Sequence, residues 1–63
     1  MQPIYQPITV DFAPLTAEQQ AAFCRARLLQ LVEVKPAELS ANEQRQLLQE
    51  RSGLSMRLHL LGA

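Results

Sequence analysis

Residues 16–34 (TAEQQAAFCRARLLQLVEV) form the longest stretch of the chain with a single clear period. Thr16, followed three residues later by Gln19, has the pattern of a capping box, in which each side chain binds the backbone N–H of the other residue. Pro36 disfavours helical backbone at the residue before it. The sequence therefore predicts one long helix that begins at Thr16 and ends near Val34.

The apolar residues of this helix predict contacts on more than one of its sides. One set recurs at steps of three and four residues, which aligns its members on a face that we expect to pack in the core. Its members are Ala17, Ala21, Cys24, Leu28 and Leu31, with Val32 at the edge. Leu29 lies about 100° from this face, and Phe23 lies on the other side of it. Because a helix that is apolar on several sides is contacted on several sides, the sequence predicts a second apolar surface.

This second surface is the predicted interface with a partner or with a second copy of the chain. Arg25 and Arg27 flank the apolar face on opposite sides, and the planar guanidinium group of arginine suits protein interfaces. The predicted interface consists of Phe23, Arg25, Arg27, Leu28, Leu29 and Val32.

A chain of 63 residues forms one small domain, predicted to span residues 1–63, with residues 1–7 as a flexible or extended arm. A domain of this size buries only about 60% of the surface that its unfolded chain exposes. One cysteine and one histidine exclude an intramolecular disulfide and a zinc site of four Cys or His ligands. Because oligomerisation is the remaining means of stabilising so small a core, we expect a homodimer or a complex with another protein.

The charge of the chain disfavours nucleic acid as its partner. Six basic and six acidic residues balance to a net charge of zero, whereas nucleic-acid-binding domains usually carry a basic excess. No apolar run approaches the 18 or so residues that span a membrane, and the N-terminus lacks the pattern of a secretory signal. A single unpaired cysteine suits a reducing compartment, so we expect a cytoplasmic protein without membrane partners.

The first 14 residues are expected to contain a strand and no helix. Pro3, Pro7 and Pro14 each lack a backbone donor, and apolar residues alternate with polar ones over residues 8–12. This period of two, rich in β-branched residues, predicts a short edge strand.

A second helix is predicted to follow Ser40, which forms another capping box with Glu43. This helix is expected to bury Leu47 and Leu48 and to end at Gly53, because glycine suits the left-handed position after a helix. The short connector predicts that the two helices are antiparallel neighbours.

Residues 54–61 (LSMRLHLL) fit two patterns. Apolar and polar residues alternate, as in a strand. The same segment, interpreted as a helix, places Leu54, Leu58 and Leu61 on one face. Gly53 as a helix terminator favours the strand.

The predicted fold class is therefore α+β and mostly helical, with the order β-α-α-β: an antiparallel helical hairpin with short strands at its two ends. A lone two-stranded sheet is barely stable in water, so pairing across a two-fold axis again favours a dimer. The predicted core consists of Ala21, Cys24, Leu31, Leu47, Leu48, Leu54 and Leu58.

Cys24 and His59 are the only candidates for nucleophilic catalysis. Cys24 lies in the middle of the apolar face, where cysteine behaves as a small hydrophobic residue. His59 lies on the polar side of its segment, and the carboxylates are spread along the chain without forming a pair or a metal cluster. The sequence therefore predicts no enzyme, no catalytic, cofactor-binding or metal-binding residue, and no small-molecule substrate.

Two outlines resemble DNA-binding families. Residues 8–52, a strand followed by two helices, resemble the ribbon-helix-helix repressors in outline, which would place Asp11 against the DNA phosphates. The second outline, a helix-turn-helix with Gly53 at the turn, leaves only Arg57 and His59 to contact bases. Neither outline carries a specific motif, so neither identifies a family.

We therefore expect a small non-enzymatic protein–protein interaction module that acts as a regulator, adaptor or inhibitor of a partner protein. Chains of this size are often encoded by phages, plasmids or operons. The alternatives are a dimeric DNA-binding transcriptional regulator and a structural subunit of a larger assembly.

Overall fold

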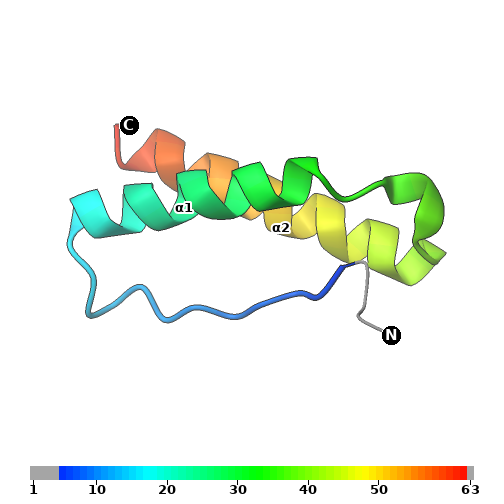
Figure 1. Ribbon diagram of the computed structural model, residues 1–63. Coiled ribbons are helices and arrows are strands. Elements are labelled where there is room, and N and C mark those ends of the chain that lie inside the picture. The colour runs from blue at the N-terminus through cyan, green and yellow to red at the C-terminus, as the bar shows by residue number, and fades with distance from the viewer. Residues whose placement is uncertain (1–4, 63) are drawn as a thin grey trace.

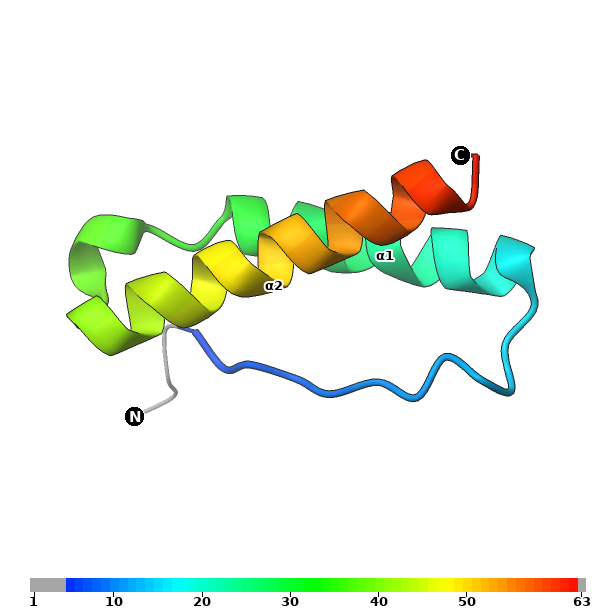
Figure 2. The ribbon, with the colours of Figure 1, turned by 180° about the vertical axis from the view of Figure 1, so that it is seen from behind.

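The chain folds into an antiparallel helical hairpin with an extended N-terminal segment along one of its faces (Figure 1). The computed structural model describes residues 5–62. Helix α1 spans Ala17–Val32, the short 3-10 turn η1 spans Pro36–Glu38, and helix α2 spans Ala41–Leu60. Seen from behind, α2 crosses in front of the middle of α1 (Figure 2).

Both helices begin at the predicted capping boxes. The Thr16 hydroxyl accepts a hydrogen bond from the Gln19 backbone N–H at 3.1 Å, and the Gln19 side chain accepts one from the Thr16 N–H at 3.0 Å. Ser40 and Glu43 repeat this arrangement, with distances of 3.2 and 3.0 Å. These bonds satisfy backbone donors that have no partner within the helix, which explains why the helices begin where they do.

The predicted β-α-α-β fold is wrong, because residues 5–62 contain no strand. Residues 8–12 are extended, but they pair with no other segment. Residues 54–61 were predicted as the second strand, but they continue α2 as far as Leu60, with Leu61 as its C-cap. Leucine and methionine favour helix over strand, and the helix keeps Leu54 and Leu58 on the face that packs against α1. With no second strand present, the first has nothing to pair with.

Gly53 lies inside α2 rather than at its end. Its backbone does not adopt a positive φ, whereas Gly62, just beyond the helix, has a φ of 74°. A helix interior tolerates a single glycine at a cost of about 1 kcal/mol relative to alanine. The prediction that Gly53 ends the helix therefore assigned to it the role that Gly62 performs.

The core lies between the two helices and the N-terminal segment. The buried residues are Tyr5, Ala21, Cys24, Leu31, Leu39, Leu47 and Leu54. Leu58 is half-buried against this cluster. Leu48, predicted in the core, is instead 61% exposed, because it lies about 100° around the helix from the fully buried Leu47.

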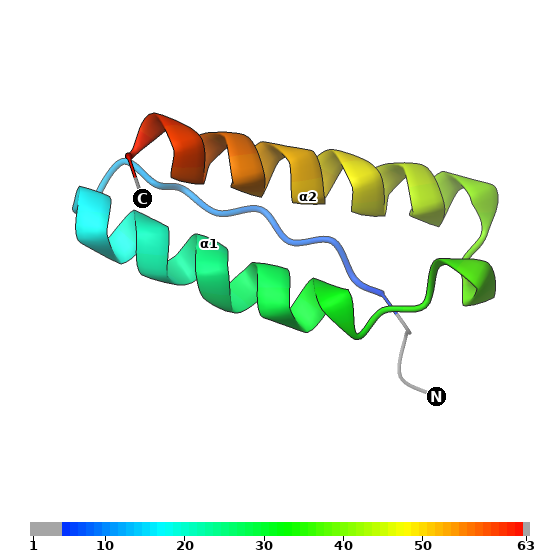
Figure 3. The same ribbon diagram turned by 90° about the horizontal axis from the view of Figure 1, so that it is seen from above.

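The N-terminal segment, residues 5–15, lies along the groove between the helices, as the view from above shows (Figure 3). We call this segment the strap. It runs antiparallel to α1 and parallel to α2, and it covers one face of the hairpin while the opposite face carries no further element in residues 5–62. Neither α1 nor α2 is long and apolar enough to cross a bilayer.

Replacing Gly53 by alanine is expected to stabilise the protein by about 0.5–1 kcal/mol, because alanine has the higher helix propensity. A Cβ atom at Gly53 meets nothing within 4 Å, so the substitution introduces no clash. Chemical denaturation followed by circular dichroism measures the change. Gly62→Ala is the matched control and is expected to bring no gain, since its φ of 74° is strained for alanine. A loss of stability in Gly53→Ala would contradict the continuous α2.

Candidate protein interface

Three side chains tie the strap to both helices. The Tyr5 hydroxyl from the strap donates to Glu50 Oε1 of α2 at 2.6 Å. Arg27 of α1 donates from Nε to Glu50 Oε2 at 2.7 Å and from Nη2 to Glu50 Oε1 at 3.2 Å. Its Nη2 also donates to the Gln6 carbonyl oxygen at 2.8 Å. Glu50 is therefore the common acceptor that links all three segments, and we call Tyr5, Arg27 and Glu50 the strap triad.

The contacts within the strap triad lower the pKa of Glu50 and raise the pKa of Tyr5. Burial opposes the charge of Glu50, but the hydrogen bonds from Arg27 and Tyr5 and the charge of Arg27 outweigh it, so the pKa of Glu50 lies below its usual value. Burial, with the hydrogen bond to Glu50 and its negative charge, raises the pKa of Tyr5 to about 12. The triad is thus most stable with Glu50 ionised and Tyr5 neutral.

A second set of contacts holds the other end of the strap. The rings of Phe12 and Phe23 pack edge to face, with centroids 5.8 Å apart. The guanidinium carbon of Arg57 lies 4.1 Å from the centroid of the Phe12 ring, on which it makes a cation–π contact. The Gln20 amide donates to the carbonyl oxygens of Phe12 and Leu15 at 3.3 and 3.0 Å.

These contacts border a shallow, open pocket between the strap and the hairpin, with a volume of about 250 Å³. Its walls combine aliphatic and aromatic side chains with one acidic and one basic group. The lining residues are Ile8, Val10, Phe12, Phe23, Gln49, Glu50, Gly53, Leu54 and Arg57. Glu50 and Arg57 are each already engaged, Glu50 in the strap triad and Arg57 by the Phe12 ring and by Gln20 Oε1 at 3.0 Å.

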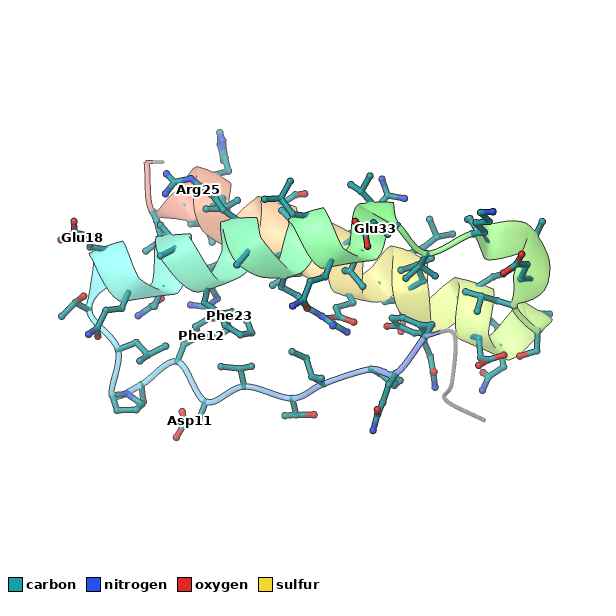
Figure 4. All side chains as sticks on the ribbon, viewed as in Figure 1. Asp11, Phe12, Glu18, Phe23, Arg25 and Glu33 are labelled. Carbon is teal, nitrogen blue, oxygen red and sulfur yellow. The ribbon has the colours of Figure 1, made fainter. Side chains whose placement is uncertain are left out.

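The strap divides the predicted interface residues into two groups. Phe23 and Arg27 point toward the strap, where they contact Phe12 and Glu50. Arg25 points to the opposite side of α1, as Figure 4 shows. Leu28 and Val32 follow Arg25 by three and seven residues, so they lie on the same side of the helix.

The group that faces away from the strap forms an apolar surface on α1. Leu29 and Val32 are each 71% exposed, whereas Leu28 is half-buried against the core. Arg25 is exposed beside them. Together, Arg25, Leu28, Leu29 and Val32 line a shallow and almost wholly apolar depression. Of the residues predicted at the interface, these four are therefore accessible to a partner.

The two candidate nucleophiles occupy different environments. Cys24 is a free thiol with no exposed surface, packed in the core. His59 is exposed near the end of α2. Within residues 5–62, no group of three or more His, Cys, Asp or Glu side chains could hold a metal ion.

No local pattern in the sequence predicts the strap triad. Tyr5 lies in a proline-rich arm with no helical period, and Glu50 is one of many polar residues in the second predicted helix. The contact between them spans 45 positions, so no local spacing could reveal it. The available signal was only that the single tyrosine of the chain lies in this proline-rich arm.

Comparison with known proteins provides no relative from which a function could be transferred: no family model, curated protein or solved structure matches the chain.

Replacing Tyr5 by phenylalanine is expected to lower the free energy of unfolding by about 2 kcal/mol at neutral pH, the usual contribution of a hydrogen bond to a charged group. Because the pKa of Tyr5 is higher in the folded state, its contribution is complete below pH 10 and is lost as the pH rises from 10 toward 12. Denaturation of both proteins across this range measures the difference. A difference that stays constant up to pH 12 would contradict the hydrogen bond to Glu50.

Glu50→Gln tests the acidic side of the strap triad. Because the pKa of Glu50 is depressed in the folded state, the stability that it provides is present above the usual glutamate pKa of about 4.3 and is lost as the pH falls through the folded-state value. The variant is expected to be less stable than the wild type at pH 7, and the gap is expected to close on acidification.

Proposed function

We propose that the chain is a small, non-enzymatic protein–protein interaction module that acts in the cytoplasm as a regulator, adaptor or inhibitor of another protein. The observation that carries the proposal is the exposure of Leu29 and Val32 on the helix that also builds the core. Two aliphatic side chains that lie side by side in water retain apolar surface that a partner would bury.

The arginine beside this surface supports the same proposal. Arg25 is exposed, and the residues one turn from it are Ala21, Ala22, Leu28 and Leu29, none of which carries a charge. An arginine at the edge of an apolar surface is typical of protein interfaces, because its planar group binds a carboxylate with two hydrogen bonds.

The non-enzymatic part of the proposal rests on Cys24. A reactive thiol needs an accessible and electropositive setting, whereas Cys24 has no exposed surface and packs among leucines. In this setting the thiol acts as a small apolar side chain.

The interface can be located by photocrosslinking. One variant carries a photoreactive side chain in place of Leu29, and a matched control carries it in place of Met56, which is 65% exposed on α2. Irradiation of cells that produce each variant is expected to give discrete protein adducts from position 29 and few from position 56. Equal adduct formation from both positions, or none from position 29, would contradict the proposed interface.

Two aspartate substitutions separate folding from association. Leu29→Asp is expected to leave stability within about 0.5 kcal/mol of the wild type, because the side chain is 71% exposed, and to abolish the adducts of a photoreactive group placed at Val32. Leu28→Asp is expected to lower the free energy of unfolding by more than about 2 kcal/mol, since it brings a charge against the core. Circular dichroism during denaturation distinguishes the two.

A further inference from the structure

The outer face of α1 carries a charge pattern that is symmetric about Leu29. Arg25 lies four residues before Leu29, and Glu33 lies four residues after it. Four helical residues rise about 6 Å, so the two opposite charges flank Leu29 at equal distances on one face of the helix. All three side chains are exposed, and Figure 4 shows the positions of Arg25 and Glu33 along α1.

The two charges cannot neutralise each other within one chain. They are separated by about 12 Å along the helix axis, which is beyond the reach of an ion pair. The ion pair found within residues 5–62 joins Arg27 to Glu50, on the strap side of the hairpin. Both outer charges are therefore available to groups outside the chain.

The remaining residues of this face permit close approach of another helix. Ala22 and Ala26 are small and exposed, and Val32 is 71% exposed. Small side chains allow two helix axes to approach to about 8 Å, the shorter end of the usual range. The face thus presents Leu29 and Val32 beside two alanines, with a positive charge toward one end and a negative charge toward the other.

We propose that this face binds the same face of a second copy of the chain, with the two α1 helices antiparallel and Leu29 on the two-fold axis. In that arrangement, a residue a given number of positions before Leu29 in one chain faces the residue the same number of positions after Leu29 in the other chain. Arg25 then faces Glu33 of the partner subunit, and Ala26 faces Val32 of the partner subunit. The two-fold axis makes two equivalent ion pairs on either side of a leucine–leucine contact.

A second copy fits this face because the pattern is complementary to itself. A two-fold interface requires that one surface match its own rotated image, and opposite charges placed equally about a central apolar residue meet this condition. A parallel pairing in register would set Arg25 against Arg25, and like charges in contact weaken association. This inference rests on the proposed function, because it names the occupant of the same interaction surface.

The test is a charge exchange measured by analytical ultracentrifugation of the full chain over a hundredfold range of concentration. The variants are Arg25→Glu, Glu33→Arg and the double variant Arg25→Glu/Glu33→Arg. The wild type is expected to show a monomer–dimer equilibrium. Each single variant is expected to raise the dissociation constant about tenfold or more, because two symmetric pairs become repulsive at once. The double variant is expected to return it to within about threefold of the wild type.

Arg45→Glu is the matched control. It makes the same change of charge on an exposed residue of α2, away from the proposed contact, and is expected to leave the dissociation constant within about twofold of the wild type. Raising the salt concentration is expected to narrow the difference between the wild type and the single variants, because salt screens exposed charges. Circular dichroism verifies that each variant is folded.

Two results would overturn the antiparallel dimer: a wild-type chain that is monomeric over the whole range, or a double variant that associates no better than the single ones. Neither result removes the proposed function if the photoreactive group at position 29 still forms adducts with a different protein. Loss of all adducts at position 29, together with an intact dimer, would instead refute the proposed location of the interface.

Discussion

The hydrogen bonds at Glu50 hold the strap against the two helices, and the strap covers the side of the core that the helices leave open. A pair of packed helices buries one stripe of each and leaves the groove between them open to water. Tyr5 fills part of this groove, where it is only 4% exposed, and its hydroxyl reaches Glu50. Because Arg27 binds the same carboxylate from α1, the strap and both helices are linked through one acceptor.

The strap can cover this side of the core without belonging to a sheet or a helix. An extended segment has unpaired backbone groups, which are costly to bury unless other atoms bind them. Side chains of α1 do so: Arg27 donates to the Gln6 carbonyl oxygen, and Gln20 donates to those of Phe12 and Leu15. Two polar residues of α1, seven positions apart, thus take the place of a neighbouring strand.

Local patterns in the sequence were sufficient to predict helix α1 and the start of helix α2. Each capping box involves residues three positions apart, so Thr16 and Ser40 could be recognised without knowledge of the fold. The same holds for the buried stripe of α1, since Ala21, Cys24 and Leu31 follow from helical spacing alone.

The end of α2 and the position of the strap could not be predicted from local patterns, because both depend on contacts between separate segments of the chain. Alternation over residues 54–61 fits a strand, yet the same leucines also align on one helical face, and only packing against α1 decides between them. Glycine often follows helices, which is why Gly53 matched the pattern of a terminator, but a helix held by tertiary contacts on both sides of a glycine continues through it. The contacts of Glu50 in the strap triad join residues 23 and 45 positions apart in the chain and had no local signal.

Arg25 and Arg27 show how α1 keeps its two surfaces separate. Two positions along a helix correspond to a rotation of about 200°, so these side chains point to nearly opposite sides. Arg27 is committed to the strap, with its side chain 13% exposed, while Arg25 remains in solvent. A change on one side therefore affects the other only through the stability of the folded chain.

This separation has a thermodynamic consequence for the proposed dimer. A partner that binds only the folded chain stabilises it in proportion to the logarithm of partner concentration, so association on the outer face would add to the stability that the strap provides on the inner one. A 63-residue chain has a small core, and its single cysteine is a free thiol buried in that core rather than part of a disulfide. The outer face of α1 is one of the places where this chain retains apolar surface, and its self-complementary charges would allow a second copy to cover it.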